Sequence, residues 1–137
     1  MSSGIQQKII FWICLINGVC AVFFGGLMIL FPLDTPLGLG ALLPAMDAFP
    51  FQEIFFQSLF WSGLALFFWN GSMNLAAVVA FMRKAAIAPK LSLVAGLMLI
   101  AWCVFESIYL FNAAAIFYGV VGLVQVVLSW QVMKTPV

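Results

Sequence analysis

The feature that most constrains this chain is a series of long apolar runs with almost no charge. The first, residues 9–31, continues for 23 residues without a charged side chain. It is longer than the roughly 7–15-residue core of a signal peptide, and an α-helix needs about 20 apolar residues to cross a membrane. Three further runs follow at residues 54–81, 91–111 and 113–133. The sequence therefore predicts an all-α fold, a four-helix transmembrane bundle in up-down order.

Composition indicates that lipid is the main solvent. The chain has 137 residues, of which 66% are hydrophobic and 7% charged, whereas a soluble domain has about 25% charged residues. Four spans use most of this length, so we expect a single transmembrane domain over residues 1–137. The lipid bilayer is the expected partner, together with a second copy or another membrane protein. Five basic residues cannot form a phosphate-binding face, so nucleic acid is not expected to bind.

The positions of the charges predict the orientation. The first connection, residues 32–52, contains Asp34 and Asp47 but no Lys or Arg. By the positive-inside rule this connection is extracytoplasmic, whereas both termini and the second connection are cytoplasmic. The basic residues on which this orientation rests are Lys8, Arg83, Lys84, Lys90 and Lys134.

The first connection is rich in proline and glycine, which excludes a long helix, yet it remains rather apolar. Irregular backbone is not tolerated deep in lipid, so we expect this segment to lie in the outer interface. Two arrangements remain open. Residues 37–46 either form a shallow helical turn that covers the bundle or belong to a plain surface loop.

Glu106 is the one acidic or basic side chain inside a predicted span, about 8 Å below the outer boundary at 1.5 Å per residue. One hypothesis makes it a proton-exchanging or cation-contacting group, because intramembrane acids often mark ion or substrate paths. The alternative is a neutral acid that hydrogen-bonds between helices. Side chains expected at a similar depth are Gln57, Ser58, Tyr109 and Tyr118.

A second polar layer is predicted closer to the cytoplasm. Asn17, Asn74 and Gln125 fall at about the same depth, roughly 10–12 Å from the inner boundary. Asn70 lies four residues before Asn74 and therefore on the same helix face. Interhelical hydrogen bonds between such amides are the favoured interpretation, and a polar functional site is the alternative.

The remaining chemistry is sparse. The three cysteines, Cys14, Cys20 and Cys103, form no C-x-x-C pair, and the chain has no histidine, so we expect no metal site and no cofactor. No nucleophile–base pair, paired carboxylate site or phosphate-binding loop can be assembled. We therefore expect a protein that is not an enzyme.

Several short motifs are spread over nearly the whole chain, namely Gly25 to Met28, Pro32 to Leu39, Pro50 with Phe51, Gly63 to Phe67, Asn70 with Gly71, Trp102 with Glu106, and Tyr118, Gly122 and Gln125. Together they resemble those of a widespread group of small, uncharacterised bacterial four-span membrane proteins. The chain is also similar, more distantly, to DoxX-like proteins, which are associated with oxidative chemistry. The resemblance implies a bacterial inner membrane and a shared bundle with a structured outer loop, and it brings no catalytic residue.

Three functional hypotheses follow. The leading one is a non-catalytic multi-pass protein that acts as an assembly partner or binds a small apolar molecule or lipid. The second is an oligomeric transporter or channel that conducts protons or a small solute past Glu106. The third is a quinone-linked redox protein, which would depend on Cys103.

Overall fold

The computed structural model of the protein describes residues 2–135. Within that part of the chain, four helical segments are long and apolar enough to cross a membrane, which confirms the predicted all-α four-helix bundle. The first, third and fourth spans are single helices, namely α1 (Ser3–Leu30), α5 (Ala88–Tyr109) and α6 (Ala113–Lys134). The second span, Phe60–Met82, comprises α3 (Phe60–Leu64), the π-helix η3 (Ala65–Ser72) and α4 (Met73–Met82).

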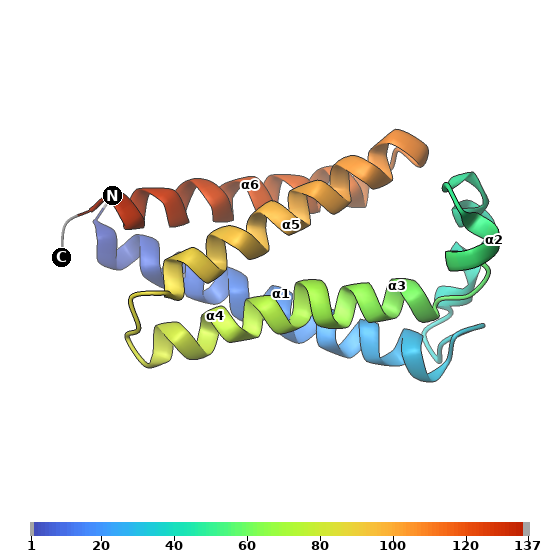
Figure 1. The fold of residues 1–137 in the computed structure, drawn as a ribbon, viewed down its shortest axis with the longest axis horizontal. Coiled ribbons are helices and arrows are strands. Elements are labelled where there is room, and N and C mark those ends of the chain that lie inside the picture. Colours follow the sequence, from blue (N-terminus) through green and yellow to red (C-terminus); the bar gives the residue numbers. More distant parts are fainter. Residues whose placement is uncertain (1, 136–137) are drawn as a thin grey trace.

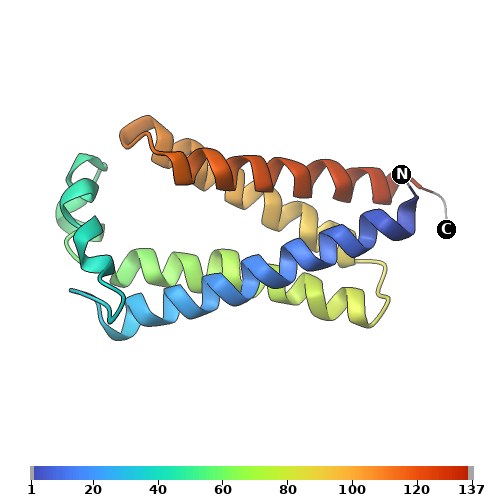
Figure 2. The same ribbon diagram turned by 180° about the vertical axis from the view of Figure 1, so that it is seen from behind.

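The four spans are arranged as two antiparallel pairs. α1 packs along the second span, and α5 packs along α6. The pairs meet at the end where both termini and the α4–α5 turn lie, and they diverge toward the other end (Figures 1 and 2). We call the first end the basic end, because it carries all five Lys and Arg residues, and the second the loop end.

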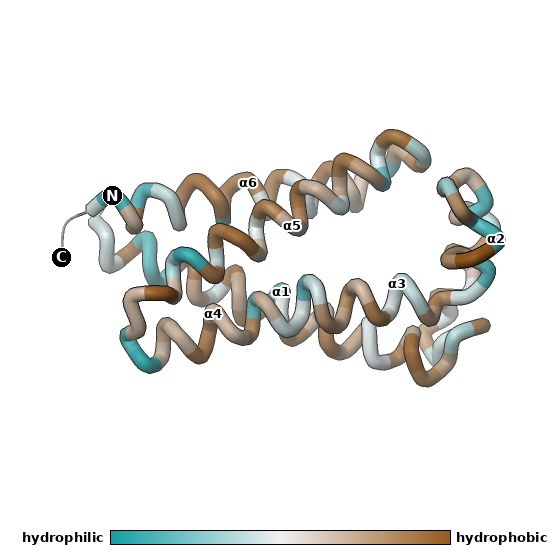
Figure 3. The backbone as a smooth tube through the Cα atoms, in the orientation of Figure 1, coloured by the Kyte–Doolittle hydropathy of each residue, from teal (hydrophilic) through white to brown (hydrophobic). Residues whose placement is uncertain are grey.

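Apolar surface covers the length of the bundle between its two ends. The tube in Figure 3 is mostly brown to white along the spans, whereas hydrophilic residues are frequent at the basic end and in the loop. In the most apolar stretch of each span, only 28% of the residues are buried. The outward side chains include Trp12, Phe68, Phe117 and Trp130, each at least half exposed. Lipid contact is the environment that suits such a surface.

Glycines bring the two helices of each pair into backbone contact. A Cβ atom at Gly25 would lie 2.8 Å from the Phe67 nitrogen and 2.9 Å from the Gly63 oxygen, so α1 and α3 touch there. In the other pair, a Cβ atom at Gly96 would lie 3.1 Å from the Gly122 oxygen. Small residues allow this approach in membrane bundles, where dispersion contacts drive association.

The loop between the first two spans covers the loop end. It contains the 3₁₀-helices η1 (Leu39–Leu42) and η2 (Pro44–Ala48) and the short helix α2 (Gln52–Phe55). Phe49 is buried between this loop and α5, with ring centroids 4.9 Å from Phe56, 5.4 Å from Phe105 and 6.3 Å from Tyr109. This aromatic cluster joins the loop to the second helix pair.

Two span boundaries differ from those expected. α1 begins at Ser3 rather than at residue 9, because the Ser2 hydroxyl caps its first turn by accepting from the Ile5 nitrogen at 3.4 Å. The second span begins at Phe60 rather than at residue 54. There the Leu59 nitrogen donates to the Pro32 oxygen at 2.7 Å, which ties this backbone to the end of α1 and interrupts the helix. The other two spans lie within three residues of their expected positions.

Candidate functional site

A group of polar side chains lies in the interior, where the two helix pairs meet. We call it the central polar cluster. Every span contributes to it, and each member is 0% exposed. Its members are Cys14 from α1, Asn74 from α4, Ser92 from α5, and Gln125 and Ser129 from α6.

The Gln125 amide is the centre of the cluster. Its Nε2 lies 3.0 Å from Asn74 Oδ1 and 3.4 Å from Cys14 Sγ. Two further acceptors belong to Ser92, the carbonyl oxygen at 3.1 Å and Oγ at 3.2 Å. Ser129 Oγ also donates to Ser92 Oγ, at 3.0 Å. Gln125 Nε2 has only two hydrogens, so these four acceptors share them and the cluster is rich in acceptors.

Asn70 extends this network along the second span. Asn74 Nδ2 lies 2.8 Å from both the carbonyl oxygen and Oδ1 of Asn70. The structure therefore brings together Asn70, Asn74 and Gln125 of the predicted second polar layer. The bonds from Gln125 to Asn74 and Ser92 join different helices, and such interhelical hydrogen bonds are worth about 0.6–2 kcal/mol each, so the cluster holds the two helix pairs in register.

Two polar atoms in this region have no hydrogen-bond partner. One is Gln125 Oε1, an acceptor, and the other is Asn17 Nδ2, a donor, and both atoms are buried. Asn17 lies three residues after Cys14, so it belongs to the next turn of α1 on the same side. An unsatisfied buried group costs about 1–3 kcal/mol. These two atoms are therefore the unsatisfied part of the polar interior.

The predicted site at the loop end has a different arrangement. Glu106 Oε1 accepts from Asn112 Nδ2 at 2.8 Å, and Asn112 caps α6 by accepting from the Ala115 nitrogen at 2.9 Å. Tyr109 stacks in the Phe49 cluster, Gln57 is exposed between α2 and α3, and Tyr118 is exposed on α6. The described hydrogen bonds do not link Glu106 to Gln57, Tyr109 or Tyr118.

Sequence reasoning did not place Cys14 in the polar layer, and it missed Ser92 and Asn112, for which the sequence contains a signal. Ser92 lies four residues before Gly96, so it extends the small-residue face of α5 by one turn. Asn112 immediately precedes an alanine-rich helix start, which is a favoured position for an N-cap. In the described residues 2–135, no three His, Cys, Asp or Glu side chains lie close enough to hold a metal ion.

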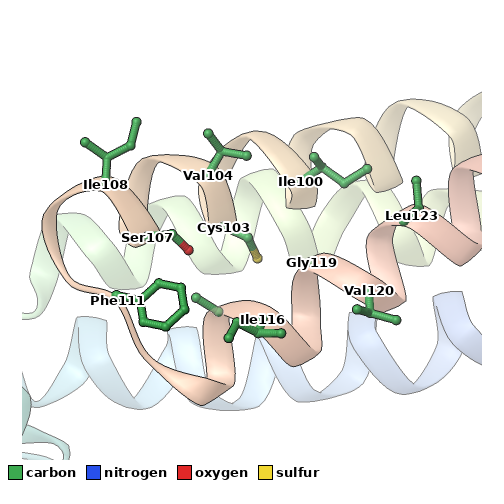
Figure 4. Close-up of a pocket in the computed structure, with 11 residues that line it drawn as sticks. Ile100, Cys103, Val104, Ser107, Ile108, Phe111, Ile116, Gly119, Val120 and Leu123 are labelled. Atoms are coloured by element: carbon green, nitrogen blue, oxygen red, sulfur yellow. The ribbon is translucent and has the colours of Figure 1, made fainter.

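A second feature is an apolar groove on the outer side of the α5–α6 pair (Figure 4). Its volume is about 530 Å³. Leu123 lies two residues from Gln125, about 200° around the helix, so the groove faces away from the central polar cluster. The groove is lined mainly by aliphatic side chains, among them Ile100, Val104, Ile108, Ile116, Val120 and Leu123.

The floor of the groove is formed by small residues. Cys103 is 5% exposed and Ala115 is 3% exposed, and Gly119 lies beside them. A Cβ atom at Gly119 would meet only Cys103 Cβ, at 3.6 Å, so the space above this glycine is open. Ser107 supplies a hydroxyl in the half of the groove nearer the α5–α6 turn (Figure 4).

These features define the class of protein as a polytopic α-helical membrane protein, with an internal polar cluster and a lipid-facing groove. Comparison with family models, curated proteins and solved structures found no match to this chain.

Proposed function

We propose that this chain is a non-catalytic multi-pass protein of a bacterial inner membrane that binds a small apolar molecule or a lipid chain in the α5–α6 groove. The observation that carries the proposal is the groove itself, about 530 Å³ in volume and open to the side where lipid lies. Small-molecule sites in proteins typically have volumes of about 300–1,000 Å³ and mostly apolar linings.

The chemistry of the lining supports an apolar occupant. Aliphatic side chains beside a floor of Cys103, Ala115 and Gly119 offer dispersion contacts along one side of a hydrocarbon chain, and the groove is open on the other. The Ser107 hydroxyl is suited to accept or donate one hydrogen bond to a polar end of the ligand. Because the groove opens laterally, such a ligand enters from the bilayer rather than from water.

The groove also supports a non-catalytic role. Its heteroatom side chains are the Cys103 thiol and the Ser107 hydroxyl, and its lining contains no acid or base to activate either. The nearby Glu106 carboxylate has the Asn112 amide as its hydrogen-bond partner. Binding without a chemical step is the activity that this set of groups can perform.

The proposed orientation places both termini and the α4–α5 turn in the cytoplasm. All five basic residues lie at this end of the bundle, whereas Asp34, Asp47 and Glu53 belong to the loop at the opposite end. The membrane potential and anionic lipids favour basic residues on the cytoplasmic side.

Photolabelling tests the groove. The purified protein in detergent is incubated with a diazirine-bearing palmitic acid, irradiated and digested, and the labelled peptides are identified by mass spectrometry. We expect labelling concentrated in residues 100–123, which excess palmitate prevents. Gly119→Phe fills the groove and should weaken this saturable labelling about tenfold, equivalent to about 1.4 kcal/mol.

Gly26→Phe is the matched control. A Cβ atom at Gly26 meets only Phe67 Cε2, at 4.0 Å, so this glycine on α1 also has open space beside it. This variant should label like the unmodified protein. Labelling that is uniform over all four spans, or that palmitate does not reduce, would contradict the proposal.

A further inference from the structure

The charged side chains of this protein are separated between its two ends. Asp34, Asp47 and Glu53 belong to the loop, and Glu106 lies near the end of α5. Residues 1–33, 54–105 and 107–137 contain no Asp or Glu. The basic end therefore has no acidic side chain to neutralise it, and its positive charge has to be balanced by anions from outside the chain.

Three of the five basic residues are concentrated where α4 meets α5. Arg83 and Lys84 follow α4 directly, and Lys90 lies in the first turn of α5. We call these three residues the basic turn. All three are exposed, and among the described residues no hydrogen bond or salt bridge involves their side chains. Figure 3 shows hydrophilic residues here, beside the apolar spans.

The backbone of the basic turn is a Schellman motif, a common way for a helix to end. The Ala85 nitrogen donates to the Ala80 oxygen at 2.9 Å, and the Lys84 nitrogen donates to the Phe81 oxygen at 3.0 Å. These backbone bonds cap the end of α4. The basic side chains are therefore not needed as its cap.

Lys84 occupies the position of this motif where glycine is strongly preferred. Its φ is 53°, in the left-handed region, and of the other described non-glycine residues only Phe51 has a positive φ. A residue with a Cβ atom is disfavoured in that conformation. A lysine at the neighbouring exposed position, Ala86, would serve the positive-inside rule equally well. Neither the turn nor the topology of the chain therefore explains a lysine at residue 84.

The surroundings of the basic turn suit a lipid better than a soluble anion. Met82 is 70% exposed and Ile87 is 53% exposed, and both lie within three residues of Lys84. Apolar side chains next to cations are typical of the boundary where lipid headgroups meet acyl chains. Basic residues at that boundary attract anionic headgroups.

We propose that the basic turn is a binding site for an anionic phospholipid, in which Arg83, Lys84 and Lys90 contact the phosphate and Met82 and Ile87 lie against the acyl chains. Arginine donates paired hydrogen bonds to a phosphate, and lysine adds a compact charge. The site is separate from the α5–α6 groove, which is lined by residues 100–123.

Native mass spectrometry of the full chain tests the site. The protein in a mild detergent is titrated with phosphatidylglycerol, or with phosphatidylcholine that has the same acyl chains, and the affinity is obtained from the lipid adducts. We expect phosphatidylglycerol to bind at least tenfold more tightly, and this preference should decrease as the ammonium acetate concentration rises. Equal affinity for the two lipids would contradict the proposal.

Lys84→Gly removes the charge but keeps the turn, because glycine suits the left-handed conformation. We expect its affinity for phosphatidylglycerol to fall about fivefold, equivalent to about 1 kcal/mol, with no change for phosphatidylcholine. Its melting temperature in detergent should not fall below that of the unmodified protein. A lower melting temperature would show that lysine stabilises the turn, which would remove the reason for assigning Lys84 to a ligand.

Lys134→Gln is the matched control, because it removes one exposed charge from the same end but from the last turn of α6. The Lys134 ammonium already lies over the Trp130 ring, 4.8 Å from its centroid. This variant should lose less than twofold in affinity for phosphatidylglycerol. An equal loss in Lys84→Gly and Lys134→Gln would show a diffuse attraction to the whole basic end, and the specific site would be wrong.

A double variant, Lys84→Gly with Ala86→Lys, moves the charge by two residues at constant net charge. It should bind phosphatidylglycerol as weakly as Lys84→Gly does, and full recovery would contradict the role of residue 84.

Glycerol 3-phosphate separates a lipid site from a site for soluble phosphate, because it carries the phosphate without acyl chains. A tenfold excess over phosphatidylglycerol should leave the lipid adduct unchanged. Displacement of the lipid would overturn its assignment as the ligand.

Discussion

At the scale of single residues, the members of the central polar cluster are hydrogen-bonded to one another, and lipid cannot replace these partners. Gln125 illustrates this, because one amide nitrogen meets side chains of α1 and α4 and both the backbone and hydroxyl of Ser92. In hydrocarbon an unpaired amide is expensive, so these contacts select one arrangement of the four spans. The same residue leaves its oxygen without a hydrogen-bond partner, which offsets part of the stability that these contacts provide.

Glu106 provides the prediction at this scale. Because its Oε1 accepts from Asn112, Glu106→Gln keeps an acceptor oxygen, and we expect a change in unfolding free energy below about 0.5 kcal/mol. Glu106→Leu removes the acceptor and should lose about 1–2 kcal/mol. Unfolding in detergent, followed by circular dichroism, measures both values.

Asn112→Ala is the companion variant, because it removes both the partner of Glu106 and the cap of α6. It should destabilise by at least as much as Glu106→Leu. If Glu106→Gln lowers the unfolding free energy as much as Glu106→Leu does, then an acceptor oxygen alone does not explain the contribution of Glu106 to stability. If Glu106→Gln instead abolishes proton flux in liposomes, the transport hypothesis replaces the structural one.

At the scale of elements, glycine contacts determine how closely the helices of each pair approach. Gly25 and Gly63 bring α1 onto α3, and Gly96 and Gly122 bring α5 onto α6. Within the first pair, the π-helix η3 carries Gly71, where an added Cβ atom would lie 2.8 Å from Val22 Cγ2 on α1. The helices are therefore in close contact at defined positions, and the polar residues one or two turns away are held at a defined rotation.

Two neighbouring glycines on α1 test this view. At Gly25 an added Cβ would clash with backbone atoms of the second span, at 2.8 and 2.9 Å, whereas at Gly26 it has space. Both substitutions gain the same helix propensity on replacement by alanine. We expect Gly25→Ala to be about 1–3 kcal/mol less stable than Gly26→Ala, from unfolding in detergent. Equal stability would show that the two helices adjust their separation at no cost.

At the scale of the whole molecule, the two ends are built differently. The basic end is closed by apolar packing and by a hydrogen bond from Gln6 to Gln131 at 2.6 Å, which joins α1 to α6. The loop end is covered by short helices that contact α5 through Phe49. The spans themselves close the basic end, whereas a separate loop segment covers the loop end.

Cysteine labelling tests the proposed orientation of the whole chain. In a cysteine-free background, Ala86→Cys lies in the exposed turn at the basic end, and Leu42→Cys lies in the exposed part of the loop. A membrane-impermeant maleimide added to intact spheroplasts should label Leu42→Cys and leave Ala86→Cys unmodified until the membrane is opened. The reverse pattern would invert the proposed orientation.

The sequence alone determined the class of protein, a helical membrane protein, together with the number and order of its spans. The reason is that each crossing of the hydrocarbon core requires a helix of about 20 mostly apolar residues, and such runs are recognised directly in the sequence. It also determined the approximate depth of each polar residue, which follows from helical rise. Only the tertiary structure decided which polar residues meet. Gln125 reaches Ser92 and Asn74, and Glu106 reaches Asn112 rather than Gln57 or Tyr118.

The physical reason is that depth along a helix axis says nothing about rotation around that axis or about which helix lies alongside. Those quantities depend on contacts between distant segments, such as Gly25 against Gly63 and the Leu59 nitrogen on the Pro32 oxygen. The second of these contacts also moved the start of the second span to Phe60, in a stretch apolar enough to continue the helix. Local sequence determines which polar and small residues each helix carries, and the packing of the two helix pairs determines which of these residues come into contact.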